Sequence, residues 1–445
     1  MNKRAAFLTL GCKVNQYETD AMAQLLEQDG YTIVDFRDQA DVYIINTCSV
    51  TNMADRKSRQ MINRARKNNP RAVVVAAGCY VQAQEKNLQE KGMADILVGN
   101  NRKKDIVSLL SRYFEEREQI SDVPDLSRRT EYEPLFVTRL SGHTRAYLKI
   151  QDGCDQFCSY CIIPYTRGRI RSRKPEDILE EVKELTGQGF KEFVLTGIHI
   201  SSYGKDLGTT DLSDLLGRLN AMEGVERIRL GSLEPRIITE EFARTLAGYE
   251  KICPHFHLSL QSGCDETLKR MNRKYTTAEY EEALGILRRT FKDPALTTDV
   301  IAGFVGETDE EFEQTCAYLE KINLYEMHVF KYSLRKGTRA ERMEGHVPEQ
   351  IKTARSDRLL AMTQRHKKAY MAAYLGRKES VLLEEEVLRE GKRYMQGYTK
   401  HYIKVLIPVE DSPVSLHSNQ IIDANIERIW DEDTTLGKVS IEFSH

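Results

Sequence analysis

Three cysteines, Cys154, Cys158 and Cys161, form a CxxxCxxC motif inside the stretch DGCDQFCSYCIIP. Thiolates at this spacing suit zinc or an iron–sulfur cluster. A structural zinc site usually closes with a fourth ligand nearby, but the next cysteine along the chain is Cys253. A four-iron cluster held by three cysteines instead leaves one iron open to a substrate or cofactor. We therefore favour an iron–sulfur cluster over buried structural cysteines.

A second set of cysteines is spread along the first part of the chain. Cys12, Cys48 and Cys79 each follow directly on an apolar stretch with the character of a strand, in FLTLGC, YIINTC and VVAAGC. Parallel strands place their carboxyl ends at one edge of a sheet, so these thiols are expected to meet there and share a cluster. The remaining cysteines show no ligand pattern and are interpreted as buried or incidental: Cys253, Cys264 and Cys316.

Strand and helix signals alternate over the first 115 or so residues, which predicts an open α/β domain with a mostly parallel sheet. The expected strands lie at residues 5–10, 41–50, 72–80 and 94–100. Residues 116–142 are polar, contain two prolines and are predicted to be a linker.

The alternation resumes at Thr144 and predicts six β/α units, a partial (β/α)6 barrel. The expected strands lie at residues 146–150, 192–197, 227–232, 255–260, 298–304 and 327–333. The CxxxCxxC motif directly follows the first of them. Active sites of β/α barrels lie at the carboxyl ends of the strands, so this position favours a functional cluster.

A charged helix is predicted from about residue 348 to 375, followed by a small antiparallel β-barrel with strands near 379–388, 393–408 and 438–443. Aromatic and basic side chains interleave in the barrel, a pattern typical of RNA binding by base stacking. They are Tyr394, Tyr398, His401 and Tyr402 with Arg393, Lys400 and Lys404. Ordinary strand tyrosines beside solvated lysines are the alternative.

The net charge of −2 gives no overall sign of nucleic-acid binding, but basic residues cluster locally. Residues 54–71 carry seven basic side chains and one acidic, and residues 165–174 carry five basic and none acidic. In an extended segment, four alternating arginines share one face and suit phosphate contacts: Arg167, Arg169, Arg171 and Arg173. Solvated helix and loop faces are the alternative.

Hydrophobic residues make up 40% and charged residues 30% of the 445, as in soluble globular proteins. No signal peptide and no apolar run of membrane-spanning length is evident, so the expected compartment is the cytoplasm. Nine cysteines in a reducing compartment favour metal binding or catalysis over disulfides.

The CxxxCxxC motif, with Tyr160 between its last two cysteines, resembles the signature of radical S-adenosylmethionine enzymes. In that superfamily the open iron binds the amino and carboxylate groups of S-adenosylmethionine. Cleavage of the cofactor then yields a radical that abstracts hydrogen from C–H bonds.

The stretches TLGCKVNQYET, INTCSVT and AAGCYVQ resemble the N-terminal domain of the radical methylthiotransferase family, and the resemblance covers nearly the whole chain. It implies a second four-iron cluster on Cys12, Cys48 and Cys79 that supplies or carries sulfur, with S-adenosylmethionine as both methyl donor and radical source. It also implies three domains: an N-terminal cluster domain (2–116), a radical S-adenosylmethionine core (140–370) and an RNA-binding TRAM domain (373–441).

The resemblance further places cofactor contacts at the ends of the barrel strands. Thr196 and Gly197 replace the usual strand end that meets the methionine moiety, although its typical acidic residue is missing. The other expected contacts are Tyr160, Ile163, Glu234, Gln261 and Ile301, with ordinary packing as the alternative for each.

Within the family, the sequence is most similar to the branch that methylthiolates carbon-2 of N6-threonylcarbamoyladenosine beside the tRNA anticodon. Rival substrates are N6-isopentenyladenosine in tRNA and a ribosomal-protein aspartate. An alternative of another class is a non-catalytic iron–sulfur protein that binds RNA. The expected partners are tRNA, a flavodoxin- or ferredoxin-like electron donor and a sulfur source, and no membrane is expected.

Overall fold

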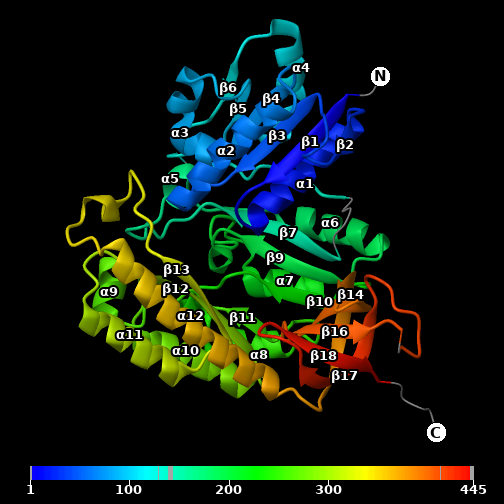
Figure 1. The fold of residues 1–445 in the computed structure, drawn as a ribbon, viewed down its shortest axis with the longest axis vertical. Coiled ribbons are helices and arrows are strands. Elements are labelled where there is room, and N and C mark those ends of the chain that lie inside the picture. Colours follow the sequence, from blue (N-terminus) through cyan, green and yellow to red (C-terminus); the bar gives the residue numbers. More distant parts are fainter. Residues whose placement is uncertain (1–2, 129, 139–143, 411, 441–445) are drawn as a thin grey trace.

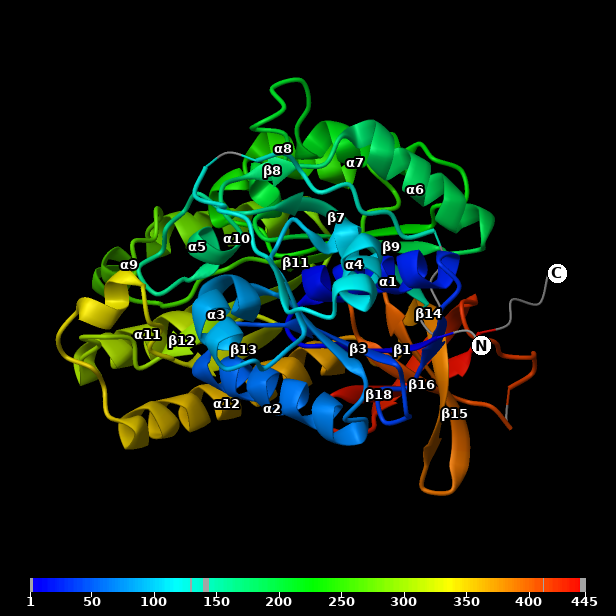
Figure 2. The ribbon, with the colours of Figure 1, turned by 90° about the horizontal axis from the view of Figure 1, so that it is seen from above.

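The computed structural model describes residues 3–128, 130–138, 144–410 and 412–440. The described residues form three domains (Figures 1 and 2). The N-terminal domain lies above a half-open barrel in the view of Figure 1, and the C-terminal barrel lies at its lower right. Among the described helices, none combines the length and the apolar character that crossing a membrane requires.

The N-terminal domain is built on a six-stranded sheet of order β2-β1-β3-β4-β5-β6, in which every pair is parallel. Its strands are β1 (Arg4–Thr9), β2 (Thr32–Val34), β3 (Val42–Thr47), β4 (Val73–Gly78), β5 (Ile96–Val98) and β6 (Ile120–Asp122). Its helices are α1 (Lys13–Gln28), α2 (Asn52–Asn68), α3 (Cys79–Glu90), η1 (Lys103–Asp105) and α4 (Ile106–Glu116). Strands β3 and β4 are buried along their whole length, with apolar clusters on both faces, as a parallel sheet requires.

The four predicted strands and the parallel sheet are confirmed, and two three-residue strands extend the sheet at its edges. Strand β6 lies inside the predicted linker, so this part of the linker belongs to the fold, while linker residues 129 and 139–142 lie outside the described residues. Further along this segment, Leu135 and Val137 are buried, and the Tyr17 hydroxyl of α1 donates to the Leu135 carbonyl at 2.7 Å. The polar composition of this segment gave no indication that Leu135 and Val137 would be buried.

The central domain confirms the six predicted β/α strands. They are β7 (Arg145–Asp152), β9 (Glu192–Gly197), β10 (Arg227–Leu230), β11 (His255–His257), β12 (Ala295–Ala302) and β13 (Glu326–Lys331), with short β8 (Arg171–Ser172) antiparallel to β7. Single bridges between Ile228 and Ile252 and between Leu233 and Leu258 join the two halves of the curved sheet. The strands therefore form an open, partial barrel.

Helices that alternate with the strands along the chain cover the outside of this barrel (Figure 2). They are α6 (Pro175–Gly187), α7 (Leu212–Asn220), α8 (Glu240–Ala247), α10 (Thr277–Thr290) and α11 (Asp309–Ile322), with the shorter α5 (Ile163–Thr166), α9 (Asp265–Arg270), η2 (Ile200–Ser202), η3 (Pro235–Ile237) and η4 (Arg339–Arg342). Both α10 and α11 begin with a complete capping box, on Thr276 and Thr308.

Helix α12 (Glu349–Ala372) confirms the predicted charged helix and leads into a closed barrel of order β14-β15-β16-β18-β17. The strands are β14 (Lys378–Arg389), β15 (Lys392–Thr399), β16 (Lys404–Pro408), β17 (Ile421–Ile429) and β18 (Thr434–Val439). The barrel closes through a parallel pair, β16 and β18, and is otherwise antiparallel. The last predicted strand begins earlier than expected, and its final residues, 441–443, lie outside the described residues.

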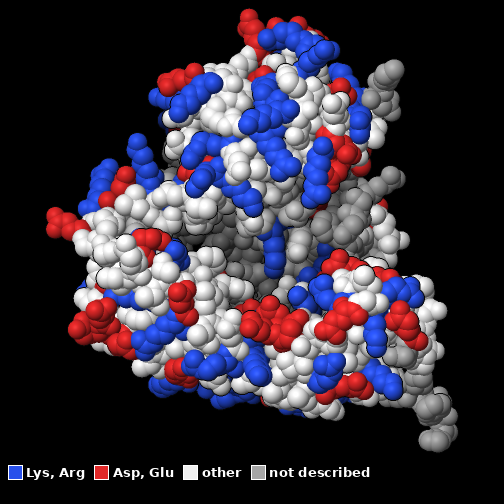
Figure 3. All heavy atoms as spheres, in the orientation of Figure 1, with Lys and Arg blue, Asp and Glu red and all other residues white. Residues whose placement is uncertain are grey.

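The N-terminal domain bridges the open side of the partial barrel. Helix α1 lies against β7 and β9 on one side. On the other side, Arg335, which follows β13, donates to Asn52 at 2.9 Å and forms an ion pair with Asp55 at 2.9 Å. The carboxyl ends of the strands of both domains therefore face a shared cleft, visible as the hollow in Figure 3.

Candidate functional site

The structure brings the ends of three neighbouring N-terminal strands together, as predicted. Cys12 caps α1 after β1, Cys48 follows β3, and Cys79 opens α3 after β4. Gly11 has φ of +111°, and a Cβ there would lie 3.1 Å from the Cys48 sulfur. Only glycine allows this approach, which brings the Cys12 loop against the Cys48 side chain.

Polar groups surround these three sulfurs. The Asn100 amide donates to the Cys79 sulfur at 3.5 Å, and the Cys12 thiol donates to Asn15 Oδ1 at 3.8 Å. Burial raises the pKa of Cys48 to about 11 and also raises that of Cys12. Metals bind the thiolate form, so loading of this site must release protons.

The other three cysteines lie in the loop between β7 and α5. Gly153 has φ of +71°, and a Cβ there would collide with the Arg169 carbonyl. Burial raises the pKa of Cys154 and of Cys161 to about 12. All three cysteines are partly exposed, so the loop opens to solvent.

Arg273 is the main charged group at this loop. Its Nη1 donates to the Cys158 sulfur at 3.2 Å, while Nε donates to the Tyr275 hydroxyl at 2.8 Å. This guanidinium is positioned to stabilise a thiolate. No local pattern predicts this contact, because Arg273 lies 115 residues beyond Cys158.

Both sets of cysteines fit four-iron clusters by their donor chemistry, since each offers three sulfurs and a side-chain donor to one of them. Among the described residues, no three His, Cys, Asp or Glu side chains are gathered tightly enough to hold a single metal ion. That is compatible with a cluster, since each cysteine binds a different iron atom.

A buried polar network joins the two sets. Arg167 donates to Asn15 Oδ1 at 2.7 Å and lies 2.8 Å from Glu18 and 3.1 Å from Asp152. Asp152 in turn accepts from the amide of Gly153, which precedes Cys154. The network therefore ties the Cys12 loop to the Cys154 loop through charged side chains with almost no exposed surface.

The expectation that four alternating arginines contact RNA phosphate is corrected for three of them. Arg167, Arg171 and Arg173 are buried, and only Arg169 is exposed. Arg171 lies 3.5 Å from Asp152, and Arg173 forms an ion pair with Glu181 at 2.6 Å. Their positive charges balance buried carboxylates and leave no exposed atom for a phosphate.

The expected cofactor residues lie around the rim of the partial barrel. Tyr160 and Ile301 pack beside Phe304 in a small apolar cluster, and Ile163 opens α5. Thr196 is buried and Gly197 partly exposed at the end of β9.

Two further expected cofactor residues are polar. Glu234 lies 3.4 Å from His199 Nε2 and 2.9 Å from Arg236. Burial alone would raise the pKa of Glu234, but the hydrogen bond from His199 and the nearby positive charges hold it below its usual value. Gln261 has φ of +78° at the bridge to Val300. A left-handed glutamine is strained, a feature that concentrates at functional sites.

Lys400 and Tyr402 lie where the C-terminal barrel meets the central domain. Lys400 Nζ donates to the Glu250 carbonyl at 3.1 Å, and the Tyr402 ring stacks on His255 at 4.8 Å. These expected RNA contacts hold the two domains together, and neither side chain is fully exposed.

Histidines inside the partial barrel were not singled out from the sequence. His257 lies 3.3 Å from Asp299 and stacks on His328, with ring centroids 5.5 Å apart. They extend the polar lining of the cleft. The alternation of inward- and outward-facing side chains along β11 and β13 is the only sequence pattern that could have predicted their position.

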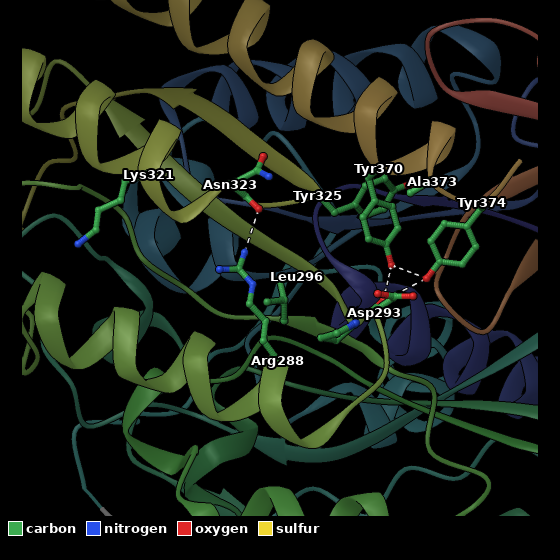
Figure 4. A pocket seen from close by; sticks show the side chains of 10 residues that line it. Arg288, Asp293, Leu296, Lys321, Asn323, Tyr325, Tyr370, Ala373 and Tyr374 are labelled. Carbon is green, nitrogen blue, oxygen red and sulfur yellow. Dashed lines mark hydrogen bonds between the residues drawn. The ribbon is translucent and has the colours of Figure 1, made fainter.

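A separate hollow of about 510 Å³ lies outside the barrel, between α10, α11 and α12 (Figure 4). Tyr370 and Tyr374 both donate to the Asp293 carbonyl there, and Arg288 caps the end of α11 through the Asn323 carbonyl. These groups serve packing between helices. The other cysteines, Cys253, Cys264 and Cys316, are buried as predicted.

Two parts of the chain match known protein families. Residues 4–99 match the family described as uncharacterized protein family UPF0004, and residues 148–319 match the radical SAM superfamily. The radical S-adenosylmethionine methyltransferase TsrM from Kitasatospora setae is similar in structure, with a TM-score of 0.56 at 16% identity over 74% of this chain and 72% of that one. This likeness concerns the fold alone.

Curated relatives are much more similar in sequence. Threonylcarbamoyladenosine tRNA methylthiotransferase MtaB of Bacillus subtilis is 43% identical, over 90% of this chain and 89% of the relative. The MtaB protein of Aquifex aeolicus is 41% identical, over 86% and 93%. A tRNA-2-methylthio-N(6)-dimethylallyladenosine synthase of Acetivibrio thermocellus is 36% identical, over 88% and 82%.

The partial barrel, with CxxxCxxC after its first strand, defines a radical S-adenosylmethionine enzyme. The N-terminal domain distinguishes it from the superfamily at large, since it carries a second set of three cysteines. The chain belongs to the radical S-adenosylmethionine tRNA methylthiotransferase family, in the MtaB branch.

Proposed function

We propose that this enzyme adds a methylthio group to carbon-2 of N6-threonylcarbamoyladenosine beside the anticodon of tRNA. The observation that carries the proposal is identity of 37–43%, over most of the chain, to three relatives named for this substrate. The site adds a chemical reason. Two sets of three cysteines flank one cleft, and sulfur insertion needs both a radical source and a sulfur carrier.

Cys154, Cys158 and Cys161 hold one four-iron cluster, and Cys12, Cys48 and Cys79 hold the other. When bound, the first cluster and S-adenosylmethionine supply radical chemistry at a C–H bond, and the second supplies sulfur. The protein holds the cysteine loops in place through Arg167 and stabilises the Cys158 thiolate through Arg273. Tyr160, Ile163, Ile301, Thr196, Gly197, Glu234 and Gln261 remain the proposed contacts to the cofactor.

The tRNA approaches the face that carries α2. Arg56, Lys57, Arg64 and Lys67 are exposed there, and none of them forms an ion pair with a described residue. Figure 3 shows Lys and Arg side chains gathered on the N-terminal domain above the hollow. Met53, 69% exposed at the start of α2, offers an apolar contact close to Cys48. Phosphate contacts from such a face position an RNA without reading its sequence.

The closed C-terminal barrel is a TRAM domain and forms a second RNA-binding surface. A flavodoxin- or ferredoxin-like protein supplies electrons, a separate source renews the sulfur, and the reaction takes place in the cytoplasm. These partners follow from the chemistry, because cleavage of S-adenosylmethionine consumes an electron and the sulfur consumed in each turnover must be replaced.

Mass analysis of tRNA nucleosides tests the proposal. A strain that lacks the gene should lose 2-methylthio-N6-threonylcarbamoyladenosine and accumulate the unthiolated nucleoside, and the plasmid-borne gene should restore it. A Cys48→Ala copy is the matched control and should not restore it. Loss of the dimethylallyl derivative instead would assign the enzyme to the other tRNA substrate.

A further inference from the structure

One lysine beside the second cysteine set forms no ion pair with any described residue. Lys13 is the first residue of α1 and directly follows Cys12. Its side chain is exposed, with its ammonium 5.9 Å from the centre of the Tyr147 ring. Among the described residues, no hydrogen-bond or ion-pair partner of Lys13 is present.

The nearby carboxylates already have other partners. Arg145 forms an ion pair with Glu384 at 2.6 Å. Glu192 lies 2.8 Å from Arg229 and 3.5 Å from Arg227. Lys13 therefore adds a positive charge to a region whose acids are occupied by arginines.

Tyr402, a residue of the C-terminal barrel, is surrounded by the same excess of positive charge. Its ring stacks between His255 and Tyr398, and the Arg229 guanidinium lies 4.7 Å from its centre. Burial alone would raise the pKa of Tyr402, but Arg145 and Lys13 together hold it below its usual value. The region where the three domains meet thus favours an anion.

We propose that the Lys13 ammonium binds the carboxylate of the threonylcarbamoyl group and so selects this nucleoside. The inference rests on the proposed function. In adenine, one ring nitrogen lies between carbon-2 and carbon-6, and carbon-6 carries the nitrogen-6 substituent. The protein groups that act on carbon-2 and those that bind the substituent must therefore lie close together. Cys12 and Lys13 are consecutive. A dimethylallyl group carries no charge and gains nothing from this lysine.

The experiment is a binding comparison with the reconstituted holoenzyme under anaerobic conditions. Three anticodon stem-loops are used, carrying threonylcarbamoyladenosine, its methyl ester or plain adenosine. Wild-type protein should bind the free acid about tenfold to a hundredfold more tightly than the ester, since one charge-assisted contact is lost. Equal affinity of wild-type protein for the acid and the ester would overturn the inference.

Variants of Lys13 extend the comparison to a thermodynamic cycle, which measures the coupling between the lysine and the carboxylate of the nucleoside. Lys13→Ala should bind the acid and the ester equally, whereas Lys13→Arg should retain the preference. Lys91→Ala, at an exposed lysine directly after α3, is the matched control and should behave as wild type. Iron content and S-adenosylmethionine cleavage check that the clusters of each variant are intact.

The remaining outcomes separate the possible failures. If Lys13→Ala weakens binding of all three stem-loops alike, the lysine contacts a phosphate and the inference is wrong. If wild-type protein converts the acid stem-loop but Lys13→Ala retains its preference for the acid, the inference fails and the proposed function stands. If wild-type protein does not methylthiolate the acid stem-loop at all, the proposed function itself fails.

Discussion

Arg167 of the central domain and Glu18 of the N-terminal domain form a buried ion pair, with 2.8 Å between Nη1 and Oε1. Glu18 also lies 2.7 Å from Lys149 and 3.0 Å from Lys103. One carboxylate thus gathers three cations, two of which belong to the other domain. This arrangement fixes how the N-terminal domain sits on the barrel, and with it the relation between the two cysteine sets.

The first prediction concerns the stability of this interface. Glu18→Gln leaves three buried cations without their shared partner and should lower the free energy of unfolding by about 3–5 kcal/mol. Urea denaturation followed by circular dichroism measures the change. Glu27→Gln, at an exposed position of the same helix, is the control and should have little effect. A Glu18→Gln protein as stable as wild type would show that the ion pairs do not hold the domains together.

The same residue gives a prediction for pH. Burial alone would raise the pKa of Glu18, but Arg167, Lys103 and Lys149 hold it well below its ordinary value of 4.5. A depressed pKa contributes stability that is fully present above the ordinary value and is lost as pH falls through the folded value. The stability difference between wild type and Glu18→Gln should therefore stay constant from pH 7.5 to 6 and shrink below about pH 4.5. A difference that already fades between pH 7.5 and 6 would contradict this assignment.

The cysteine sets were predictable because their signals are local. CxxxCxxC lies within one loop, and Cys12, Cys48 and Cys79 each end a recognisable apolar strand. The prediction that the alternating arginines contact phosphate was wrong for three of them, because the spacing of arginines does not indicate which distant acidic residues they pair with. Glu18, one of the two acids that meet Arg167, lies 149 residues earlier in the chain.

The apolar character of a strand also decided whether it was predicted. Buried strands such as β3 and β4 stand out by their unbroken apolar runs. Strands β2 and β6 have only three residues each and show no period. Their place in the sheet comes from pairing with a longer neighbour, which is information that local sequence does not contain.

A third prediction separates the two clusters. Cys154→Ala should stop cleavage of S-adenosylmethionine. Cys48→Ala should retain cleavage but form no methylthio product, since sulfur delivery is lost. Each variant should retain roughly half of the wild-type iron after reconstitution. The measurements are 5′-deoxyadenosine and modified nucleoside from the same reaction, and normal product from Cys48→Ala would refute the two-cluster arrangement.

Arg273 allows a fourth prediction, on the reduction potential of the first cluster. Its guanidinium donates to Cys158 at 3.2 Å, and a charge-assisted donor to a ligand sulfur stabilises the reduced form. Arg273→Met should lower the potential by about 60 mV, the equivalent of losing one such bond in a one-electron couple. A redox titration followed by electron paramagnetic resonance of the Cys48→Ala background isolates this cluster. An unchanged potential would mean that Arg273 only orders the loop.

The final prediction concerns the exposed basic face of α2. Lys57 and Arg64 have no acidic partner among the described residues, so a phosphate can pair with them directly. Each of Lys57→Ala and Arg64→Ala should weaken tRNA binding and reduce the slope of log affinity against log salt by about one. Lys183→Ala, on the exposed side of α6, is the control and should leave the slope unchanged. Because phosphate contacts are indifferent to base modification, the loss should be equal for tRNA with and without the threonylcarbamoyl group. A loss confined to the modified tRNA would place α2 at the nucleoside and not along the RNA backbone.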